Sequence, residues 1–234
     1  STQESDKVPL GDPFIMLWQG KYYAYGTLSP DGIAVYVSDD LNTWTAPENV
    51  QNGLALNKFD VWADRWFWAP EVYAVNGKFY MYYSADEHIC VATSNSPLGP
   101  FKQEIQKPML DGEKCIDNSF VHKRNGVYYM TYSANSYESP FYGIGVATAT
   151  NINGPWVKSE NNPALQKPGE LVGIGHSAMF TDKEGKLRIV FHAHNSNTKI
   201  HPRNMYISTV NFEPRDGKEI MVIDKNYMTP TLKK

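Results

Sequence analysis

The sequence has few cysteines and no long hydrophobic run. Two cysteines, Cys90 and Cys115, are too few for a disulfide framework. We expect both to be structural free thiols; a single bridge is less favoured and catalysis least, because neither has a base nearby in the sequence. No stretch approaches the roughly 18 uninterrupted apolar residues that a membrane span needs. The sequence therefore predicts neither a disulfide-stabilised miniprotein nor a membrane span.

The sequence also lacks an excess of charge of either sign. Its 234 residues include 22 Lys and Arg against 25 Asp and Glu, a formal net charge of -3. Proteins that bind nucleic acid or anionic membranes usually carry a strong basic field, so we expect no nucleic-acid partner. A neutral or sugar-like partner fits this composition better.

Leucine is scarce, and no helix pattern of useful length occurs. The sequence has 12 Leu but 15 Tyr, 10 Phe and 6 Trp, and its aromatic and β-branched runs are interrupted by Gly, Pro, Asn and Asp. Half-buried strands select this composition. We therefore expect an all-β fold.

The sequence contains a fourfold internal repeat. Each copy is typical of a β-hairpin: an apolar segment, a turn that ends in Gly, and a segment with alternating aromatics. The hairpin glycines are Gly20, Gly77, Gly126 and Gly185. A third apolar run follows each hairpin and ends in an aromatic residue, and these residues are spaced 57, 55 and 56 positions apart: Trp44, Phe101, Trp156 and Phe212.

This period, with at least three strands in each repeat, is the signature of β-propeller blades. The alternative is a β-sandwich, but sandwiches seldom repeat the same turn and the same terminal aromatic four times. We predict one β-propeller domain over residues 1–234, with residues 1–7 as a flexible N-terminal tail and Lys233-Lys234 as a frayed end.

The tract from Ser38 to Trp44 resembles the Asp-box turn of sialidase-like propellers. We favour a simpler interpretation, in which an Asp-rich turn ends a strand and Trp44 is a buried plug. Trp44 and Trp156 are expected to lie buried between blades.

Polar residues stand near the start of every repeat, about eight to fourteen residues ahead of the hairpin glycine. The first strand of a propeller blade starts near the central axis, so these residues would converge on one pocket. The four segments are Gly11-Asp12-Pro13-Phe14, Trp68-Ala69-Pro70-Glu71, Cys115-Ile116-Asp117-Asn118 and Gly175-His176-Ser177. Any one Asp is better explained as a strand-start cap, but four polar openings in register favour a site.

The residue types at these openings suit carbohydrate chemistry. Carboxylates such as Asp12 and Asp117 can act as acids and bases on a glycosidic bond. The indole faces of Trp62, Trp66 and Trp68 can bind sugar rings, and Trp68 is expected to border the pocket.

Together these segments resemble glycoside hydrolase family 43, the five-bladed propeller enzymes that act on arabinan, arabinoxylan and xylan. The resemblance covers nearly the whole chain. It rests on Gly11-Asp12-Pro13 with WQGKYYAYGT, on WAPEVYAVNGKFYMYYSA, on Ile116-Asp117, on NGVYYMTYSAN, on SPLGPF and NINGPW, and on VGIGHSAMF followed by FHAHN and Pro202-Arg203. It implies an inverting hydrolase of plant polysaccharides that contain arabinose or xylose.

The resemblance also implies roles for single residues. Asp12 matches the general base, and Asp117 matches a second Asp that tunes the acid and orients the sugar. His176 matches a His that helps to hold a cation, often calcium, although a polar group plugging the axis explains it nearly as well. The expected substrate-binding residues are Trp68, Glu71, His176 and Arg203.

The remaining histidines are assigned no catalytic role. His192 and His194 alternate along a predicted strand, so they point to opposite faces and cannot both face the pocket. His88, His122 and His201 are interpreted as surface or turn residues.

The sequence departs from the family in two ways. The Glu-Gly-Pro motif that carries the family's general acid is absent, and four repeats stand where five are expected. The order of the segments indicates that one blade is missing and that the start of the third, at Asp117, is fused to the hairpin of the fourth. Glu71, Glu138 and Glu170 are candidate replacements for the acid, although none lies in the family's sequence context.

The absent acid leaves two main functions open. The first is a glycoside hydrolase, and the second is a non-catalytic propeller that binds pentose-rich glycans. A protein-interaction propeller is least favoured. We expect an oligo- or polysaccharide ligand, no organic cofactor and a monomer.

The start of the chain bears on its location. It begins Ser1-Thr2 with no Met and no apolar segment, which fits either a removed signal peptide or a trimmed sequence. The expected location is secreted or periplasmic, with a cytoplasmic one left open.

Overall fold

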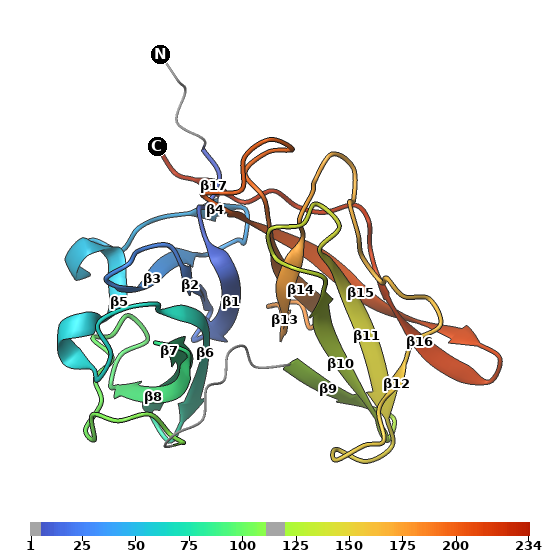
Figure 1. Cartoon of the computed structure of the whole chain (residues 1–234), viewed down its shortest axis with the longest axis horizontal. Coiled ribbons are helices and arrows are strands. Elements are labelled where there is room, and N and C mark those ends of the chain that lie inside the picture. The colour runs from blue at the N-terminus through green and yellow to red at the C-terminus, as the bar shows by residue number, and fades with distance from the viewer. Residues whose placement is uncertain (1–5, 111–119) are drawn as a thin grey trace. The chain divides into compact units, whose positions relative to one another are not determined.

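The chain is built almost entirely of β-strands (Figure 1). A computed structural model describes residues 6–110 and 120–234, and the helices in these ranges are two short 3₁₀ turns, η1 (Gln51–Gly53) and η2 (Lys58–Asp60). Four sheets correspond to the four repeats, and the all-β propeller prediction is confirmed. In the described part of the chain, no helix is long and apolar enough to cross a membrane.

The strands divide into two compact units, residues 1–118 with 230–234, and residues 119–229. The first unit contains two blades and a short two-stranded sheet. The first blade has the order β1 (Gly11–Trp18), β2 (Lys21–Thr27), β3 (Gly32–Ser38), β5 (Leu54–Asn57), and the second has β6 (Trp68–Val75), β7 (Lys78–Ala85), β8 (His88–Ser94). The short sheet pairs β4 (Thr43–Trp44) in parallel with β17 (Thr231–Leu232).

The second unit contains the other two blades. The third blade has β9 (Phe120–Arg124), β10 (Val127–Ala134), β11 (Gly143–Ala149) and β12 (Val157–Lys158). The fourth has β13 (Gly175–Thr181), β14 (Leu187–Ala193), β15 (Asn204–Arg215) and β16 (Lys218–Ile223). The core of the second unit includes residues of both blades: Tyr129, Ile144, Val146, Ile189, Phe191 and Tyr206.

The hairpin turns follow the predicted chemistry. Asn76-Gly77 and Asn125-Gly126 have positive φ at both residues, 51° and 78° in the first turn and 48° and 78° in the second. This backbone twist matches the right-handed twist of the two strands, and Asn and Gly tolerate it best. The predicted hairpins are confirmed.

The outer strands were not predicted. β5, β12 and β16 each add a fourth strand to a blade. β16 follows β15 through Asp216-Gly217, a further turn with positive φ, 50° and 76°. These strands lack the alternating aromatics on which the hairpin prediction rests.

The aromatic residues that end the repeats are buried to different degrees. Trp44 and Phe101 in the first unit are fully buried, whereas Trp156 and Phe212 in the second are half-buried. The expectation that Trp156 is buried is therefore wrong. Trp156 follows a loop and precedes the two-residue edge strand β12, which gives it little to pack against.

Backbone pairing reaches nearer both ends of the chain than expected. Lys7 pairs with Thr231, and the Lys233 N–H donates to the Trp44 carbonyl over 2.8 Å. Residues 1–5 lie outside the described ranges.

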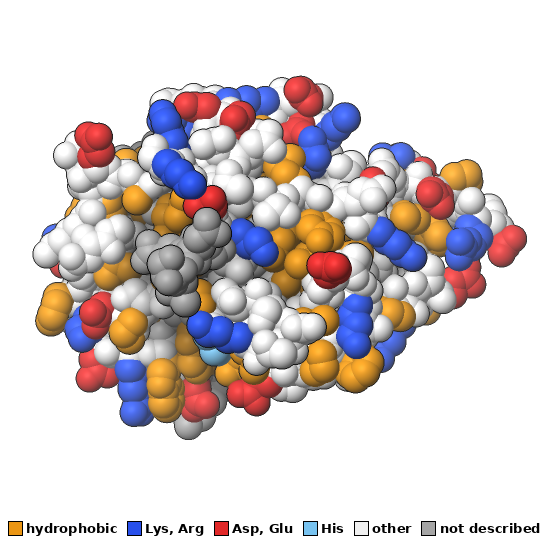
Figure 2. Space-filling model, turned by 90° about the horizontal axis from the view of Figure 1, so that it is seen from above, with side chains coloured by type: hydrophobic (Ala, Val, Ile, Leu, Met, Phe, Trp, Pro, Cys, Tyr) orange, Lys and Arg blue, Asp and Glu red, His pale blue; other side chains and the backbone are white. Residues whose placement is uncertain are grey.

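Charged side chains of both signs are intermixed on the face drawn in Figure 2.

The tract from Ser38 to Trp44 forms the expected Asp-rich turn. Asp40 Oδ1 accepts the N–H groups of Asn42 and Thr43 over 2.9 and 2.8 Å. These hydrogen bonds, above all that from Thr43, lower the pKa of Asp40. The buried Trp44 donates its Nε1–H to the Leu41 carbonyl over 2.6 Å, so the turn and the plug stabilise each other.

Asp40→Ala is expected to lower the free energy of unfolding at pH 7 by about 0.5–2 kcal/mol, as for other capping side chains. Because the pKa of Asp40 is lower in the folded state, its contribution is present at neutral pH and is lost as the pH falls through that value. Urea unfolding is measured at pH 7 and at acid pH. The difference in the free energy of unfolding between Asp40→Ala and wild type should become smaller as the pH falls. The exposed neighbour Asp39→Ala is the control, and an equal loss in both variants would contradict the assignment.

Gly175→Ala is expected to destabilise the second unit by about 1–3 kcal/mol. A Cβ at Gly175 would lie 2.0 Å from Cε1 of the buried Tyr142 ring. Gly185→Asn is the control, because Gly185 has a φ of 80° in a turn with nothing within 4 Å, and Asn tolerates that conformation. Equal denaturation midpoints for both variants would contradict this steric constraint.

Candidate functional site

Three of the four predicted blade openings lie in described residues and share one backbone feature. β1, β6 and β13 each begin with a β-bulge, at Gly11/Phe14, Trp68/Glu71 and Gly175/Ala178. The second residue of each strand has a positive φ: Asp12 at 47°, Ala69 at 51° and His176 at 45°. Bulges re-aim side chains at functional sites. The fourth opening, with Cys115 and Asp117, lies outside the described residues.

In the first unit, a hydroxyl links the openings of two blades. Thr27, at the end of β2, donates its Oγ1–H to Oδ2 of the buried Asp12 over 2.7 Å. The same oxygen accepts the Ala69 N–H over 3.3 Å. The hydroxyl has one proton, which is directed to Asp12 because the Ala69 N–H can only donate. Thr27 therefore orients the carboxylate of the predicted general base.

The second unit repeats half of this arrangement. The His176 N–H donates to Ser133 Oγ over 2.7 Å. Ser133 stands seven residues after its hairpin glycine, Gly126, as Thr27 does after Gly20. In each unit, the first blade thus uses the same hydroxyl position to bind the bulge of the blade that follows it.

Trp68, predicted to bind substrate, belongs to an aromatic pair. Its ring stacks on Trp66 with centroids 6.0 Å apart and planes at 14°. The Arg65 guanidinium lies 4.1 Å from the centroid of Trp66. Because Ala69 follows Trp68 directly, the hydrogen bond from Ala69 to Thr27 joins this aromatic surface to Asp12.

Glu71 lies further along β6. Its Oε2 accepts the hydroxyl proton of Tyr73 over 3.1 Å. Burial and the neighbouring Glu71 carboxylate raise the pKa of Tyr73 well above its usual value, so Tyr73 stays protonated and able to donate. Glu71 is therefore held by Tyr73.

Arg203 and His176 belong to the second unit. Arg203 is half-buried and its guanidinium lies 5.6 Å from the centroid of the exposed Tyr137 ring. His194 Nε2 donates to the Tyr137 carbonyl over 2.6 Å, and this hydrogen bond holds the loop that carries Tyr137. Arg203 and Tyr137 can together present a cation and an aromatic face.

The other histidines differ in part from expectation. His192 and His194 are both buried, with His192 against the Tyr142 ring, centroids 6.0 Å apart. His201 is exposed in a loop, as predicted. His88 and His122 instead lie half-buried in β8 and β9, because the hairpin register places them within strands.

Glu138 and Glu170, two of the candidate replacements for the general acid, are exposed. Cys90 is buried, and burial raises the pKa of its thiol to about 11, which fits the structural role expected for it.

The described residues do not supply a protein-built metal site. They contain no group of three or more His, Cys, Asp or Glu side chains that could hold an ion. Calcium prefers six to eight oxygen ligands, so His176 by itself is a poor partner for it. The calcium ion implied by the resemblance stays a prediction, and no step below depends on it.

Comparison with known proteins identifies the family. The model of glycosyl hydrolases family 43 matches residues 7–123 and 118–218. The chain belongs to this family. The two matches overlap at residues 118–123, directly after Asp117.

Solved structures and curated proteins of similar sequence support this family assignment. An endo-1,4-beta-xylanase from Bacteroides thetaiotaomicron is 36% identical, with a TM-score of 0.88 and 99% coverage of both chains. A thermostable family-43 glycoside hydrolase is 28% identical, with a TM-score of 0.81, covering 98% of this chain and 97% of that one. A xylosidase/arabinosidase from Bacteroides ovatus is 31% identical to this chain. The match covers 53% of this chain and 43% of that relative.

Several residues of the site were missed in the sequence. Thr27 and Ser133 could have been found from their constant offset of seven residues from the hairpin glycine. Arg65 could not, because its role depends on a loop that stacks Trp66 on Trp68.

Thr27→Val is expected to lower the free energy of unfolding by about 1–3 kcal/mol, because it removes the partner of the Ala69 N–H and of Asp12 at once. Thr27→Ser should stay close to wild type. Ser133→Ala, which removes only an acceptor, should cost less than Thr27→Val. Urea denaturation measures all three, and equal stability of the Val and Ser variants would refute the linking role of Thr27.

Proposed function

We propose that the protein is a glycoside hydrolase-type propeller that acts on plant polysaccharides containing arabinose or xylose. The observation that carries the proposal is Asp12, a buried carboxylate held by Thr27 at a bulge, together with the stacked indoles of Trp66 and Trp68, in a family 43 chain. Relatives named as a xylanase and a xylosidase/arabinosidase support the substrate class.

The geometry at Asp12 suits a general base. The hydrogen bond from Thr27 fixes the direction of the carboxylate. An ionised carboxylate in this position can take a proton from water as the water attacks the anomeric carbon, which inverts its configuration. The face of Trp68 offers a surface for the sugar ring.

A second candidate function is glycan binding without efficient turnover. It is favoured by the absence of Glu-Gly-Pro and by the position of Glu71, which is held by Tyr73. An inverting reaction needs a second carboxyl group roughly 6.5–9.5 Å from the base. Asp117 would have to act as the acid, although Asp is one methylene shorter than Glu.

The decisive experiment compares substrates that differ in their need for an acid. Aryl arabinofuranosides and aryl xylosides have leaving groups that need little protonation, whereas arabinan and xylan need a proton donor. We expect turnover of the aryl glycosides and weak or absent hydrolysis of the polysaccharides. Asp12→Asn should reduce aryl turnover by about 10²–10⁴-fold, and azide or formate should restore part of it.

The control is Asp39→Asn, which removes the charge of an exposed Asp elsewhere in the first unit and should leave turnover unchanged. Undiminished activity of Asp12→Asn would show that Asp12 is only a strand cap. Equal and fast hydrolysis of polysaccharide and aryl glycoside would show that another residue supplies the proton. Oligosaccharide binding without any turnover would establish the second function.

The location belongs to the same proposal. A secreted or periplasmic protein would meet plant polysaccharide and its fragments directly. Release of the native protein with the culture medium or periplasmic fraction would test this.

A further inference from the structure

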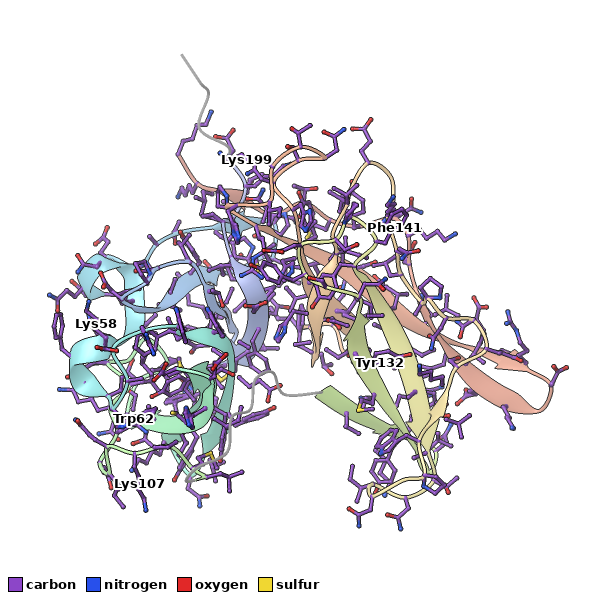
Figure 3. All side chains as sticks on the ribbon, viewed as in Figure 1. Lys58, Trp62, Lys107, Tyr132, Phe141 and Lys199 are labelled. Atoms are coloured by element: carbon purple, nitrogen blue, oxygen red, sulfur yellow. The ribbon has the colours of Figure 1, made fainter. Side chains whose placement is uncertain are left out.

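The first unit carries a connected series of contacts that begins at Trp68, the residue before Ala69. We call it the indole track, defined by Trp62, Arg65, Trp66, Trp68, Asp86 and His88. Trp62, labelled in Figure 3, lies beside β8. All six residues come from the segment before β6, the start of β6, the turn between β7 and β8, and the start of β8.

The inner end of the track is the Trp66 and Trp68 pair. A centroid separation of 6.0 Å with nearly parallel planes means that the rings overlap only in part, as in an offset stack. The two indoles therefore form a stepped surface. The inner step, Trp68, adjoins Ala69, which is hydrogen-bonded to the same Thr27 hydroxyl as Asp12.

The outer end is connected through an ion pair. Arg65, whose guanidinium lies over Trp66, donates its Nε–H to Asp86 Oδ1 over 2.8 Å. The Asp86 carbonyl lies 2.6 Å from His88 Nδ1. The His88 ring in turn contacts Trp62 edge to face, with centroids 5.3 Å apart. The track is thus one connected structure from Trp68 to Trp62.

Packing by itself does not account for this arrangement. Trp66 and Trp62 remain 42% and 37% exposed, whereas Phe67, which directly follows Trp66 and packs in the core, is 1% exposed. Trp66 also has a φ of 56°, which is unfavourable for a bulky residue and tends to occur where function constrains the backbone. The fold therefore leaves the indoles of Trp62 and Trp66 partly exposed to water, with an unfavourable backbone conformation at Trp66.

The chemistry of the track favours a neutral sugar chain. Flat aromatic faces can stack on sugar rings, and the Arg65 and Asp86 pair offers donors and acceptors to hydroxyl groups. The charges of these two residues cancel, so the track presents little field to an anion. We propose that the indole track binds the units of a neutral pentose oligosaccharide that lie beyond the unit at Asp12. This inference rests on the proposed function, because it extends the same site.

Oligosaccharide length is the variable that tests the track. Binding is measured by calorimetry in the Asp12→Asn background, where turnover is suppressed, with neutral xylose and arabinose di- and hexasaccharides. Trp66→Ala is expected to weaken hexasaccharide binding about tenfold, the effect of losing one stacked ring, and to leave disaccharide binding within about twofold. Phe59→Ala is the matched control: Phe59 is an aromatic of the same unit that is 82% exposed and outside the track.

Each outcome separates the two proposals. Equal hexasaccharide affinities for the Trp66→Ala and Phe59→Ala proteins would overturn the track and leave the proposed function standing. Preference for a uronic-acid-substituted hexasaccharide, lost at high salt, would also overturn it, because the track is assigned to neutral chains. Absence of binding to any oligosaccharide in the Asp12→Asn background would overturn both proposals. Denaturation midpoints equal to that of the background show that the variants are folded.

Discussion

The β-bulge at the start of a blade's first strand is the constraint on which the site depends. A bulge leaves one residue out of the ladder, so its N–H needs a partner outside its own sheet. In the first unit Thr27 supplies that partner to Ala69, and in the second Ser133 supplies it to His176. Within each unit, the bulge and its hydrogen bond therefore join one blade to the next. The bulge also turns a side chain out of the strand.

In the first unit, the contact between the two blades is therefore coupled to the geometry of the proposed site. Thr27 has one proton and two acceptor sites, and it uses the proton on Asp12. A residue that stabilises the contact between two blades also orients the proposed base. Because Ala69 is held by the same hydroxyl, Trp68 and the indole track are positioned relative to Asp12 by the same contact. Loss of that hydroxyl would affect stability and site geometry together.

The chain combines family 43 membership with an incomplete set of family signatures. Asp12, the residue proposed as the general base, lies in the described residues, whereas the sequence has no Glu-Gly-Pro acid motif. Two overlapping family matches meet at residues 118–123, next to Asp117. A site with a base and an aromatic surface but no identified acid suits binding of a glycan chain at least as well as its rapid hydrolysis.

The sequence by itself determined the strands, the hairpins and the candidate base, because those features depend on local chemistry. Alternating aromatics set strand faces, Asn-Gly sets the turns, and the period of 55 to 57 residues sets the number of blades. The outer strands, the burial of Trp44 against the half-burial of Trp156, and the partners of Asp12 were decided by tertiary structure. These features arise between segments far apart in the chain. Arg65 reaches Asp86 only once the second blade has folded, and Ala69 reaches Thr27 only once two blades have packed together. No local sequence pattern predicts such pairings.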